Sequence, residues 1–408
     1  MENINIYHPS KEINITLDIA SSKSESNRAL VIRALAGGKA KLANLANARD
    51  TETMQRLLST NDELRDVLDA GTTMRFLTAY YAISGEQHLM TGTERMQQRP
   101  IGILVDALKT LGAEIEYQNK EGYPPHLIKG FDKAKATDHL VIRGDVSSQY
   151  ISALLMIAPS LPKGLTLELT GKVGSKPYIQ MTLNLMKHFG VSADWNDNII
   201  KITPQQYNDI AYTIEGDWSG ASYWYSMVAL ADNAEVELLG LRENSNQGDS
   251  VLAEMMPFLG VKTEYTENGI KLTKGTSADT FEWDFTHCPD IAQTISVICA
   301  VKGIKARLTG LESLRIKETD RIEAIKNELG KFNIDVKIEG DEAIEFDGST
   351  FNHDFKDVLI NTYEDHRMAM AYAPLALLNP IKIEEPDVVK KSYPDYWRDL
   401  REAGFRIK

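Results

Sequence analysis

The feature that most constrains this 408-residue chain is a pattern that occurs six times. Six segments begin with polar residues or glycine and run into an apolar helical stretch, as in SKSESNRALVIRALAGG and SSQYISALLMIAP. Successive copies lie about 71–76 residues apart, except for a first step of about 48 residues. This regularity indicates a repeated structural unit, and its copies can be anchored at Lys23, Gly71, Ser147, Ser219, Asp290 and Asp365.

Each repeat has the same predicted order of strands and helices. A second helix start follows each anchor after about 28–30 residues, and strand-like runs such as LTLELTG lie between the two helices. Four of the second helices are followed by a hairpin pattern such as VKTEYTENGIKLTKG, in which Asn-Gly favours a tight turn. The sequence therefore predicts an α/β protein built from six β-α-β-α-β-β units.

Two repeats depart from this pattern. Only about 20 residues separate Thr51 from Gly71, against about 41–47 at the same place in later repeats, so we expect the first unit to lack its hairpin. After the last second helix the chain stops at Lys408 with no room for a hairpin, whereas residues 3–19 are strand-like and unassigned. We therefore expect the N-terminal strands to complete the sixth unit.

Grouping the units by threes predicts two domains. Residues 19–214 form the first domain, and residues 1–18 together with 215–408 form the second. The chain then crosses between the domains twice, in a hinge near residues 17–20 and 214–217.

Composition restricts the class of protein. The formal net charge of −13 argues against a nucleic-acid-binding protein, which usually carries a basic domain or stripe. The N-terminus lacks the features of a signal peptide, and no apolar run approaches the length of a membrane span. Cys288 and Cys299 are too few for a disulfide framework or a zinc site. We expect a cytoplasmic monomer that binds neither nucleic acid nor membranes.

Basic residues recur at the predicted helix starts, where the positive end of the helix dipole disfavours them. In the segment ESLRIKETDRIEAI, Thr319 is a plausible N-cap, and Lys317 and Arg321 flank the expected start. A cation there costs roughly 0.3–1 kcal/mol at exposed sites, whereas a bound anion would face both the cation and the backbone N–H groups. The other basic residues in or just before first turns are Lys23, Arg28, Arg75, Arg99 and Arg367.

Hydroxyl and amide side chains occur beside these cations, at Ser147, Ser148, Gln149 and Ser175. Arginine binds phosphate and carboxylate in a bidentate manner, so the set suits a polyanionic, polyhydroxylated small molecule. Two alternatives stay open on the residues alone. Ser147 and Ser148 can be a helix-capping pair, and Asp290, which follows a proline, can be a simple N-cap.

The motifs at these helix starts resemble those of the 5-enolpyruvylshikimate-3-phosphate synthase family. The similar strings include SKSESNRA, AGTTMR, GDVSSQYISALLMIAP, PDIAQT, RIKETDR, YEDHRMAMA and KSYPDYW, which occur in the family's order over nearly the whole chain. The resemblance implies two domains of three β-α-β-α-β-β units that close on substrate. It also implies transfer of the enolpyruvyl group of phosphoenolpyruvate to the 5-hydroxyl of shikimate 3-phosphate through a tetrahedral adduct, with release of phosphate. This reaction belongs to chorismate and aromatic amino-acid biosynthesis, and no metal or organic cofactor is implied.

The resemblance also assigns roles in the predicted first domain. Lys23 is expected to contact both substrates, while Ser24 and Arg28 bind shikimate 3-phosphate. Gly71 and Arg99 resemble the phosphoenolpyruvate clamp. The remaining residues lie on or beside the shikimate phosphate, with Gln149 between the two substrates: Ser147, Ser148, Gln149 and Ser175.

In the predicted second domain, Asp290 matches the family's acceptor of the hydroxyl proton. Lys317 is expected to bind shikimate 3-phosphate, and Glu318 is the candidate for proton transfer to the vinyl carbon, with Lys23 or Lys391 as alternatives. His366 is either a structural imidazole or a proton relay. We leave Arg75 out of the site as a structural ion-pair partner. The resemblance adds four further substrate-binding positions: Ser313, Arg321, Arg367 and Lys391.

The chain departs from the family at several positions. Asp69 stands where the family usually has asparagine, and an ionised carboxylate there would repel substrate unless arginine or lysine pairs with it. Phe76 replaces a common proline, Ser313 an asparagine and Ser21 a glycine, and Trp218 occupies a usually small position. These changes bear on the affinity for phosphoenolpyruvate and on the response to glyphosate, the family's inhibitor.

Two other functions compete with this interpretation. A related enzyme transfers enolpyruvyl to UDP-N-acetylglucosamine, but it commonly uses a loop cysteine as acid, and neither cysteine here lies in a comparable loop. A non-catalytic protein that binds phosphorylated metabolites would need the cations but not the acid–base set of Asp290, Glu318 and Lys391.

Overall fold

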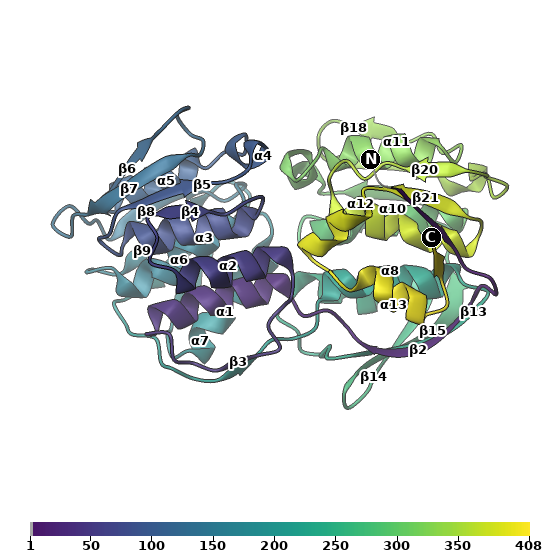
Figure 1. Ribbon diagram of the computed structural model, residues 1–408, viewed down its shortest axis with the longest axis horizontal. Helices are drawn as coiled ribbons and strands as arrows, with labels where there is room; N and C mark the ends of the chain where they lie inside the picture. The colour runs from purple at the N-terminus through teal and green to yellow at the C-terminus, as the bar shows by residue number, and fades with distance from the viewer. Residues whose placement is uncertain (1–2) are drawn as a thin grey trace. The chain divides into compact units, whose positions relative to one another are not determined.

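The computed structural model describes residues 3–408, and within them the chain forms two compact units (Figure 1). We call Ser22–Ile214 the continuous half, and the residues up to Ser21 together with Glu215–Lys408 the split half. Each half has its own hydrophobic core. Residues 1 and 2 of the predicted second domain lie outside the described residues.

Five four-stranded sheets in residues 3–408 share one strand order. In each sheet the first and second strands of a repeat pair in parallel. The third and fourth strands pair antiparallel, and the fourth strand also pairs antiparallel with the second strand. Two of these sheets lie in the continuous half, with the strands in order across each sheet: β4 (Leu64–Asp66), β5 (His88–Thr91), β7 (His126–Phe131) and β6 (Ala113–Tyr117); β8 (His139–Arg143), β9 (Leu165–Thr170), β11 (Ile199–Ile202) and β10 (Asp194–Asn196). The other three lie in the split half: β2 (Glu12–Asp18), β13 (Asn233–Leu239), β15 (Gly269–Ser277) and β14 (Leu259–Tyr265); β16 (Thr280–Asp284), β17 (Lys305–Thr309), β19 (Ala343–Asp347) and β18 (Lys337–Glu339); β20 (Val358–Ile360), β21 (Ile381–Glu384), β1 (Asn3–Tyr7) and β22 (Arg406–Ile407).

The helices follow the predicted repeat, which is confirmed. The first helices of the repeats are α1 (Lys23–Leu35), α3 (Gly71–Ala82), α6 (Ser148–Ile157), α8 (Trp218–Leu230), α10 (Ala292–Val301) and α12 (His366–Tyr372). The second helices are α2 (Arg49–Ser59), α5 (Gly102–Thr110), α7 (Lys176–His188), α9 (Leu252–Met255), α11 (Arg321–Gly330) and α13 (Tyr396–Glu402), and α4 (Glu94–Gln97) is an extra turn. Short 3-10 helices complete the list: η1 (Ala158–Ser160), η2 (Gly248–Val251), η3 (Met256–Phe258), η4 (Pro289–Ile291), η5 (Glu312–Ile316), η6 (Gly348–Thr350), η7 (Ala373–Leu377) and η8 (Pro386–Lys391).

The first helices form the centre of each half. In the continuous half α1, α3 and α6 contact one another, and in the split half α8, α10 and α12 do the same. Among them, α8 and α10 are buried on nearly all sides, because their sequences are apolar or small around the whole helix. Polar groups at their first turns are therefore held in fixed positions by a packed core.

The first repeat lacks its hairpin, as predicted. Its sheet has two strands in the described part of the chain, β3 (Leu42–Ala43) and β12 (Tyr212–Thr213), which pair in parallel. β12 follows the third repeat in the sequence, yet it supplies the first strand of the first repeat.

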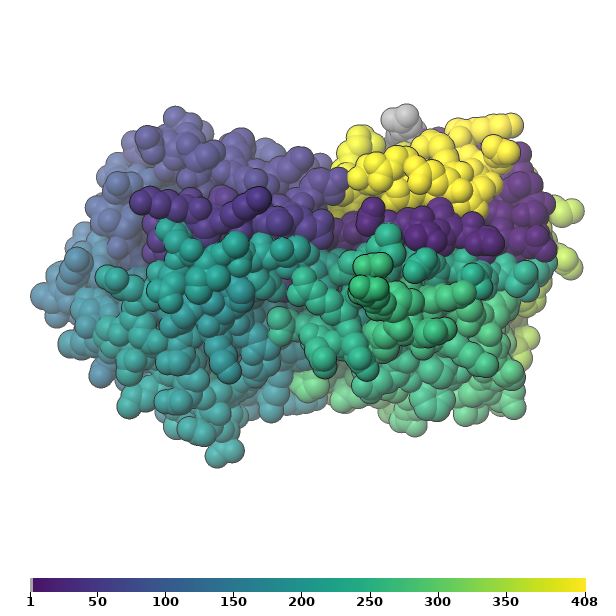
Figure 2. Space-filling model, turned by 90° about the horizontal axis from the view of Figure 1, so that it is seen from below, coloured from purple at the N-terminus to yellow at the C-terminus, as the bar shows by residue number. Residues whose placement is uncertain are grey.

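The prediction for the N-terminal strands was correct for β1 and wrong for β2. β1 lies between β21 and β22 and completes the sixth sheet (Figure 2, where the purple N-terminal segment adjoins the yellow C-terminal residues). β2 instead pairs in parallel with β13 from Asn233↔Glu12 to Leu239↔Asp18 and is the first strand of the fourth repeat. The last helix is followed by the single two-residue strand β22 and not by a hairpin, in agreement with the short C-terminal segment. Within residues 3–408, the chain forms no helix with the length and apolar character of a membrane span.

Candidate active site

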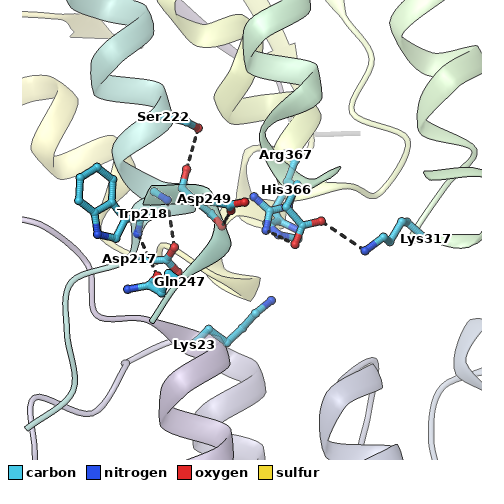
Figure 3. A network of polar contacts seen from close by, with 12 residues as sticks. Lys23, Asp217, Trp218, Ser222, Gln247, Asp249, Lys317, His366 and Arg367 are labelled. Atoms are coloured by element: carbon cyan, nitrogen blue, oxygen red, sulfur yellow. Dashed lines mark hydrogen bonds and ion pairs between the residues drawn. The ribbon is translucent and has the colours of Figure 1, made fainter. Parts of the chain in front are cut away.

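Asp290, in η4 of the split half, lies among three basic side chains. Its Oδ1 atom is 3.3 Å from Lys317 Nζ and 3.0 Å from Arg321 Nη1, and its Oδ2 atom is 3.0 Å from Arg367 Nη2. Lys317 and Arg367, both labelled in Figure 3, come from different elements of the chain. Burial opposes the charged form, but the cations outweigh burial and hold the pKa of Asp290 well below its ordinary value. Asp290 is thus an ionised carboxylate in a cationic surrounding.

Arg321, the first residue of α11, is the centre of this cluster. Its side chain is 2% exposed and donates to three carboxylates: Nη1 to Asp290 at 3.0 Å, Nη2 to Glu318 at 3.0 Å and Nε to Asp365 at 2.7 Å. Burial lowers the pKa of the guanidinium, but Asp365, Glu318 and Asp290 outweigh it and raise the pKa above the ordinary value.

Glu318 and Lys391 extend the cluster. The Glu318 Oε1 atom is 3.2 Å from Lys391 Nζ, while Oε2 binds Arg321. Lys391 is 5% exposed at the end of η8. Alternating charges therefore run from Asp290 through Arg321 and Glu318 to Lys391, an arrangement that can bind anionic groups and move a proton.

The start of α12 positions two more predicted residues. Asp365 caps this helix, because its Oδ1 atom accepts from the Arg367 backbone N–H at 2.9 Å. The ring of His366 is buried, and its Nδ1 atom lies 3.5 Å from Asp365 Oδ1. One buried carboxylate thus fixes the backbone before Arg367 and the side chain of Arg321.

The predicted N-cap of α11 was wrong by one residue. Asp320, not Thr319, caps the helix: its Oδ1 atom accepts from the N–H groups of Ile322 and Glu323 at 3.1 and 3.2 Å. An aspartate oxygen is a better cap than a threonine hydroxyl, which places Arg321 rather than Asp320 at the first helical position. Lys317 and Glu318 accordingly lie in the connection before the helix.

Sequence reasoning missed Asp249, which lies in η2 and is 3% exposed. Its Oδ2 atom accepts from the Ser219 hydroxyl. Burial and the nearby Asp290 raise the pKa of Asp249 to about 7. The site thus pairs one carboxylate that stays ionised with another that holds a proton near neutral pH. No sequence pattern marks Asp249, because its state depends on burial in the folded chain.

Arg28 binds neutral oxygens in the continuous half. Its guanidinium is buried and donates to Thr182 Oγ1 at 2.8 Å, Ser152 Oγ at 3.1 Å and Ser24 O at 2.8 Å. Phe76 stacks on it, with the ring centroid 5.3 Å from Cζ. Burial lowers the pKa of this guanidinium to about 10. These contacts join α1, α6 and α7 around one buried cation, which suits an anion-binding site.

A second group of cations surrounds the start of α3. The Arg99 guanidinium packs so closely on Gly71 that a Cβ atom there would lie 2.6 Å from Nη1. Arg75, which the sequence analysis left out of the site, donates from Nη1 to Gly71 O at 2.8 Å. Helix geometry explains this contact, since residues four apart share one face of a helix and their side chains lean toward its N-terminus.

The polar residues of α6 and α7 were predicted from the sequence to bind phosphate. Ser147 is the N-cap of α6 and accepts from the Gln149 N–H at 3.4 Å, with Ser148 as the first helical residue. Gln149 Nε2 donates to Thr72 Oγ1 at 3.1 Å, which connects α6 to the start of α3. Ser175 precedes α7 with a left-handed backbone, φ 49°.

Two further residues that the sequence predicts to bind substrate are Lys23 and Ser313. Lys23 Nζ lies 3.5 Å from Asp50 Oδ2, and Asp50 is buried in the first turn of α2. Ser313 lies half-buried in η5 and, within the described residues, makes no hydrogen bond to the Asp290 cluster. Among residues 3–408 no group of three or more His, Cys, Asp or Glu side chains is arranged to hold a metal ion.

Comparison with known proteins identifies the family. The family model described as EPSP synthase (3-phosphoshikimate 1-carboxyvinyltransferase) matches residues 7–61 and 55–400. The chain is 52% identical over 400 residues to a 3-phosphoshikimate 1-carboxyvinyltransferase of Bacteroides fragilis, covering 97% of each chain. The chain belongs to the EPSP synthase family. A relative of that name from Citrobacter koseri is 35% identical over 431 residues, with 98% of each chain covered. An EPSP synthase structure from Acinetobacter baumannii matches the whole fold with a TM-score of 0.79 at 18% identity.

Local partners surround four of the residues that the sequence analysis singled out as unusual for the family: Ser21, Asp69, Phe76 and Trp218. The Asp69 carboxylate lies 2.7 Å from Arg49 Nη2, the kind of pairing that an aspartate there requires. Phe76 covers the guanidinium of Arg28. Trp218 is fully buried, and its Nε1 atom donates to Glu215 Oε1 at 2.9 Å. Ser21 forms an antiparallel bridge with Gly216.

Proposed function

We propose that this chain transfers the enolpyruvyl group of phosphoenolpyruvate to the 5-hydroxyl of shikimate 3-phosphate and releases phosphate. The observation that carries the proposal is the ionised Asp290 carboxylate held by Lys317, Arg321 and Arg367, in a chain that belongs to the EPSP synthase family over most of its length. The reaction needs a base for the hydroxyl, an acid for the vinyl carbon, and cations for the phosphate and carboxylate groups.

Asp290 accepts the proton of the attacking hydroxyl. Before substrate binds, the cations around Asp290 make it a weak base, because they hold its pKa low. Substrate phosphate and carboxylate groups compete for the same cations, so binding raises the proton affinity of Asp290 at the moment the hydroxyl is positioned. Loss of a proton and phosphate from the tetrahedral adduct then completes the transfer.

Glu318 delivers the proton to the vinyl carbon. Its contact with Lys391 supports this role, because the ammonium 3.2 Å away can give its proton to Glu318, which passes it to the vinyl carbon and leaves Lys391 as a neutral amine. Lys391 and Lys23 are the alternative donors. Lys317 binds shikimate 3-phosphate, and the phosphoenolpyruvate anion is held by Arg321, Arg367 and Lys391.

The continuous half supplies further binding residues. Arg28 is supported as a ligand of shikimate 3-phosphate by its burial among neutral oxygens. Gly71 and Arg99 bind phosphoenolpyruvate, and Lys23 contributes to both substrates. Ser147 and Ser148 hold the shikimate phosphate group, and Ser24 also binds shikimate 3-phosphate. Gln149 lies between the two substrates with Ser175 beside them, and Ser313 is a further substrate contact.

The proposal includes the domain roles. Residues 19–214 bind shikimate 3-phosphate, and residues 1–18 with 215–408 carry proton transfer and phosphoenolpyruvate binding, with a hinge near 17–20 and 214–217. We further propose a cytoplasmic monomer without nucleic-acid or membrane partners, which the net charge of −13 supports. Sedimentation of the purified protein at the mass of one chain is the expected result, and a dimer mass contradicts it.

Transfer to UDP-N-acetylglucosamine is not favoured. Cys288 and Cys299 are buried, and burial raises the pKa of both thiols, which opposes a role as reactive acid or nucleophile.

The test is phosphate release from phosphoenolpyruvate with either acceptor. We expect turnover with shikimate 3-phosphate and none with UDP-N-acetylglucosamine, and strong loss of turnover in Lys23→Met. Release with the sugar nucleotide alone would reverse the assignment, and binding without release in either mixture would indicate a non-catalytic protein.

A further inference from the structure

Asp69 places a negative charge beside a group of cations in the continuous half. It lies two residues before Gly71, at the start of α3, where the guanidinium groups of Arg75 and Arg99 meet the backbone. A carboxylate at this position reduces the positive potential that the helix start and the two arginines create together. Such a charge weakens binding of any anion there unless it is neutralised.

The backbone around Asp69 is fixed. The Val67 N–H donates to Thr91 O at 2.9 Å, the Ala70 N–H to Val67 O at 3.0 Å, and the Leu68 N–H to Asp66 Oδ1 at 2.8 Å. The intervening Leu68 is left-handed, with φ 56°. The turn therefore fixes the backbone position of Asp69, two residues before Gly71.

Arg49 neutralises this carboxylate from a different helix. It is the first residue of α2, and its Nη2 atom lies 2.7 Å from Asp69 Oδ2. The Thr73 hydroxyl donates to Asp50 O at 3.1 Å and ties the start of α2 to the first turn of α3. The pair is half-exposed, with side chains 44% and 30% accessible, so it contributes little to stability.

We propose that the Arg49–Asp69 ion pair sets the affinity for phosphoenolpyruvate by cancelling a charge that otherwise repels the substrate at the start of α3. The inference rests on the proposed function, since it takes Gly71 and Arg99 as phosphoenolpyruvate ligands. Arg49 acts through Asp69 and is a positioning residue. Its removal changes the binding of the anion while the acid–base groups stay in place.

A double-mutant cycle tests this role. Arg49→Met removes the charge but keeps an unbranched side chain, and Asp69→Asn removes the opposite charge without changing shape. We expect Arg49→Met to raise KM for phosphoenolpyruvate roughly three- to tenfold, with kcat and KM for shikimate 3-phosphate within about twofold of wild type. The double variant should return to within about twofold of Asp69→Asn, because no carboxylate then needs a partner.

Lys129→Met is the matched control. Lys129 forms an ion pair of 2.5 Å with Glu116 on β7 and β6 of the same half, also half-exposed, and its loss should leave both KM values unchanged. Calorimetric titration with phosphoenolpyruvate in the presence of shikimate 3-phosphate should give the same order of affinities when each protein also carries Asp290→Asn, which slows turnover.

The outcomes separate this inference from the proposed function. If wild type binds phosphoenolpyruvate more tightly than Arg49→Met but releases no phosphate, the proposed function fails and the ion-pair role stands. If wild type turns over and Arg49→Met has the same KM, the ion-pair role is wrong. A raised KM that persists in the double variant also overturns it, because Arg49 then contacts the substrate itself. Absence of any phosphoenolpyruvate binding overturns both.

Discussion

Replacing Arg321 with methionine removes the positive charge at the centre of the Asp290 cluster while keeping much of the side-chain volume. The guanidinium is 2% exposed, and its strongest partner, Asp365, is fully buried at 2.7 Å from Nε. Without the arginine this carboxylate loses its counter-ion in a site that water does not reach. Breaking a buried pair by removing one partner costs roughly 3–5 kcal/mol, and we expect a loss of that size in the free energy of unfolding.

An exposed pair of the same length is the control. Arg307 Nη2 lies 2.7 Å from Glu339 Oε2, with side chains 40% and 48% exposed, and Arg307→Met should cost at most about 1 kcal/mol. Urea unfolding followed by the fluorescence of Trp218 and Trp224, both buried in the split half, measures both losses. Equal losses in the two variants would refute the reasoning, since the N–O distances match and only burial differs.

Three further predictions follow from the same contacts. Burial raises the pKa of Asp249 to about 7, so the stability from its protonated form is fully present below about pH 4 and is lost as the pH rises through 7. As the pH rises from 4 to 8, the free energy of unfolding of Asp249→Asn, measured in urea, should therefore gain roughly 2–4 kcal/mol relative to wild type. A difference between the two proteins that does not change with pH contradicts this prediction. Burial raises the pKa of the Cys288 and Cys299 thiols, so iodoacetamide at pH 8 should label neither thiol in the native protein and both thiols in urea. Rapid labelling of the native protein contradicts the buried positions. Gly71→Ala inserts a Cβ atom 2.6 Å from Arg99 Nη1 and 2.7 Å from Arg75 Nη1. The displaced guanidinium groups should raise KM for phosphoenolpyruvate about ten- to hundredfold with little change in Tm. An unchanged KM would show that these arginines do not bind the substrate.

The repeat was predictable from the sequence because its helices and strands have distinct hydrophobic periods. The strand β13, NAEVELL, alternates in burial along its length, and α8 is buried on nearly every side. Pairing partners were harder to predict, because β2 has the same alternation whichever strand lies beside it. Its parallel register with β13 joins segments that are far apart in the sequence, which the alternation does not encode.

The candidate site was predictable where function depends on residue type at a helix start, as for Lys317 and Arg321. It was not predictable where function depends on burial or on contacts distant in sequence. Asp249 has a raised pKa only because the fold buries it near Asp290, and Arg49 meets Asp69 across 20 residues of sequence. The contact of Arg75 with Gly71 O depends on the direction of the arginine side chain along the helix, which residue type alone does not give.

The most direct test of the account is the turnover of Asp290→Asn with phosphoenolpyruvate and shikimate 3-phosphate. The amide keeps the shape of the side chain but cannot accept the hydroxyl proton. We predict that kcat falls by roughly 10²–10⁴-fold while calorimetry shows shikimate 3-phosphate bound within about tenfold of wild-type affinity. A variant that retains wild-type kcat would contradict the role of Asp290 as the base.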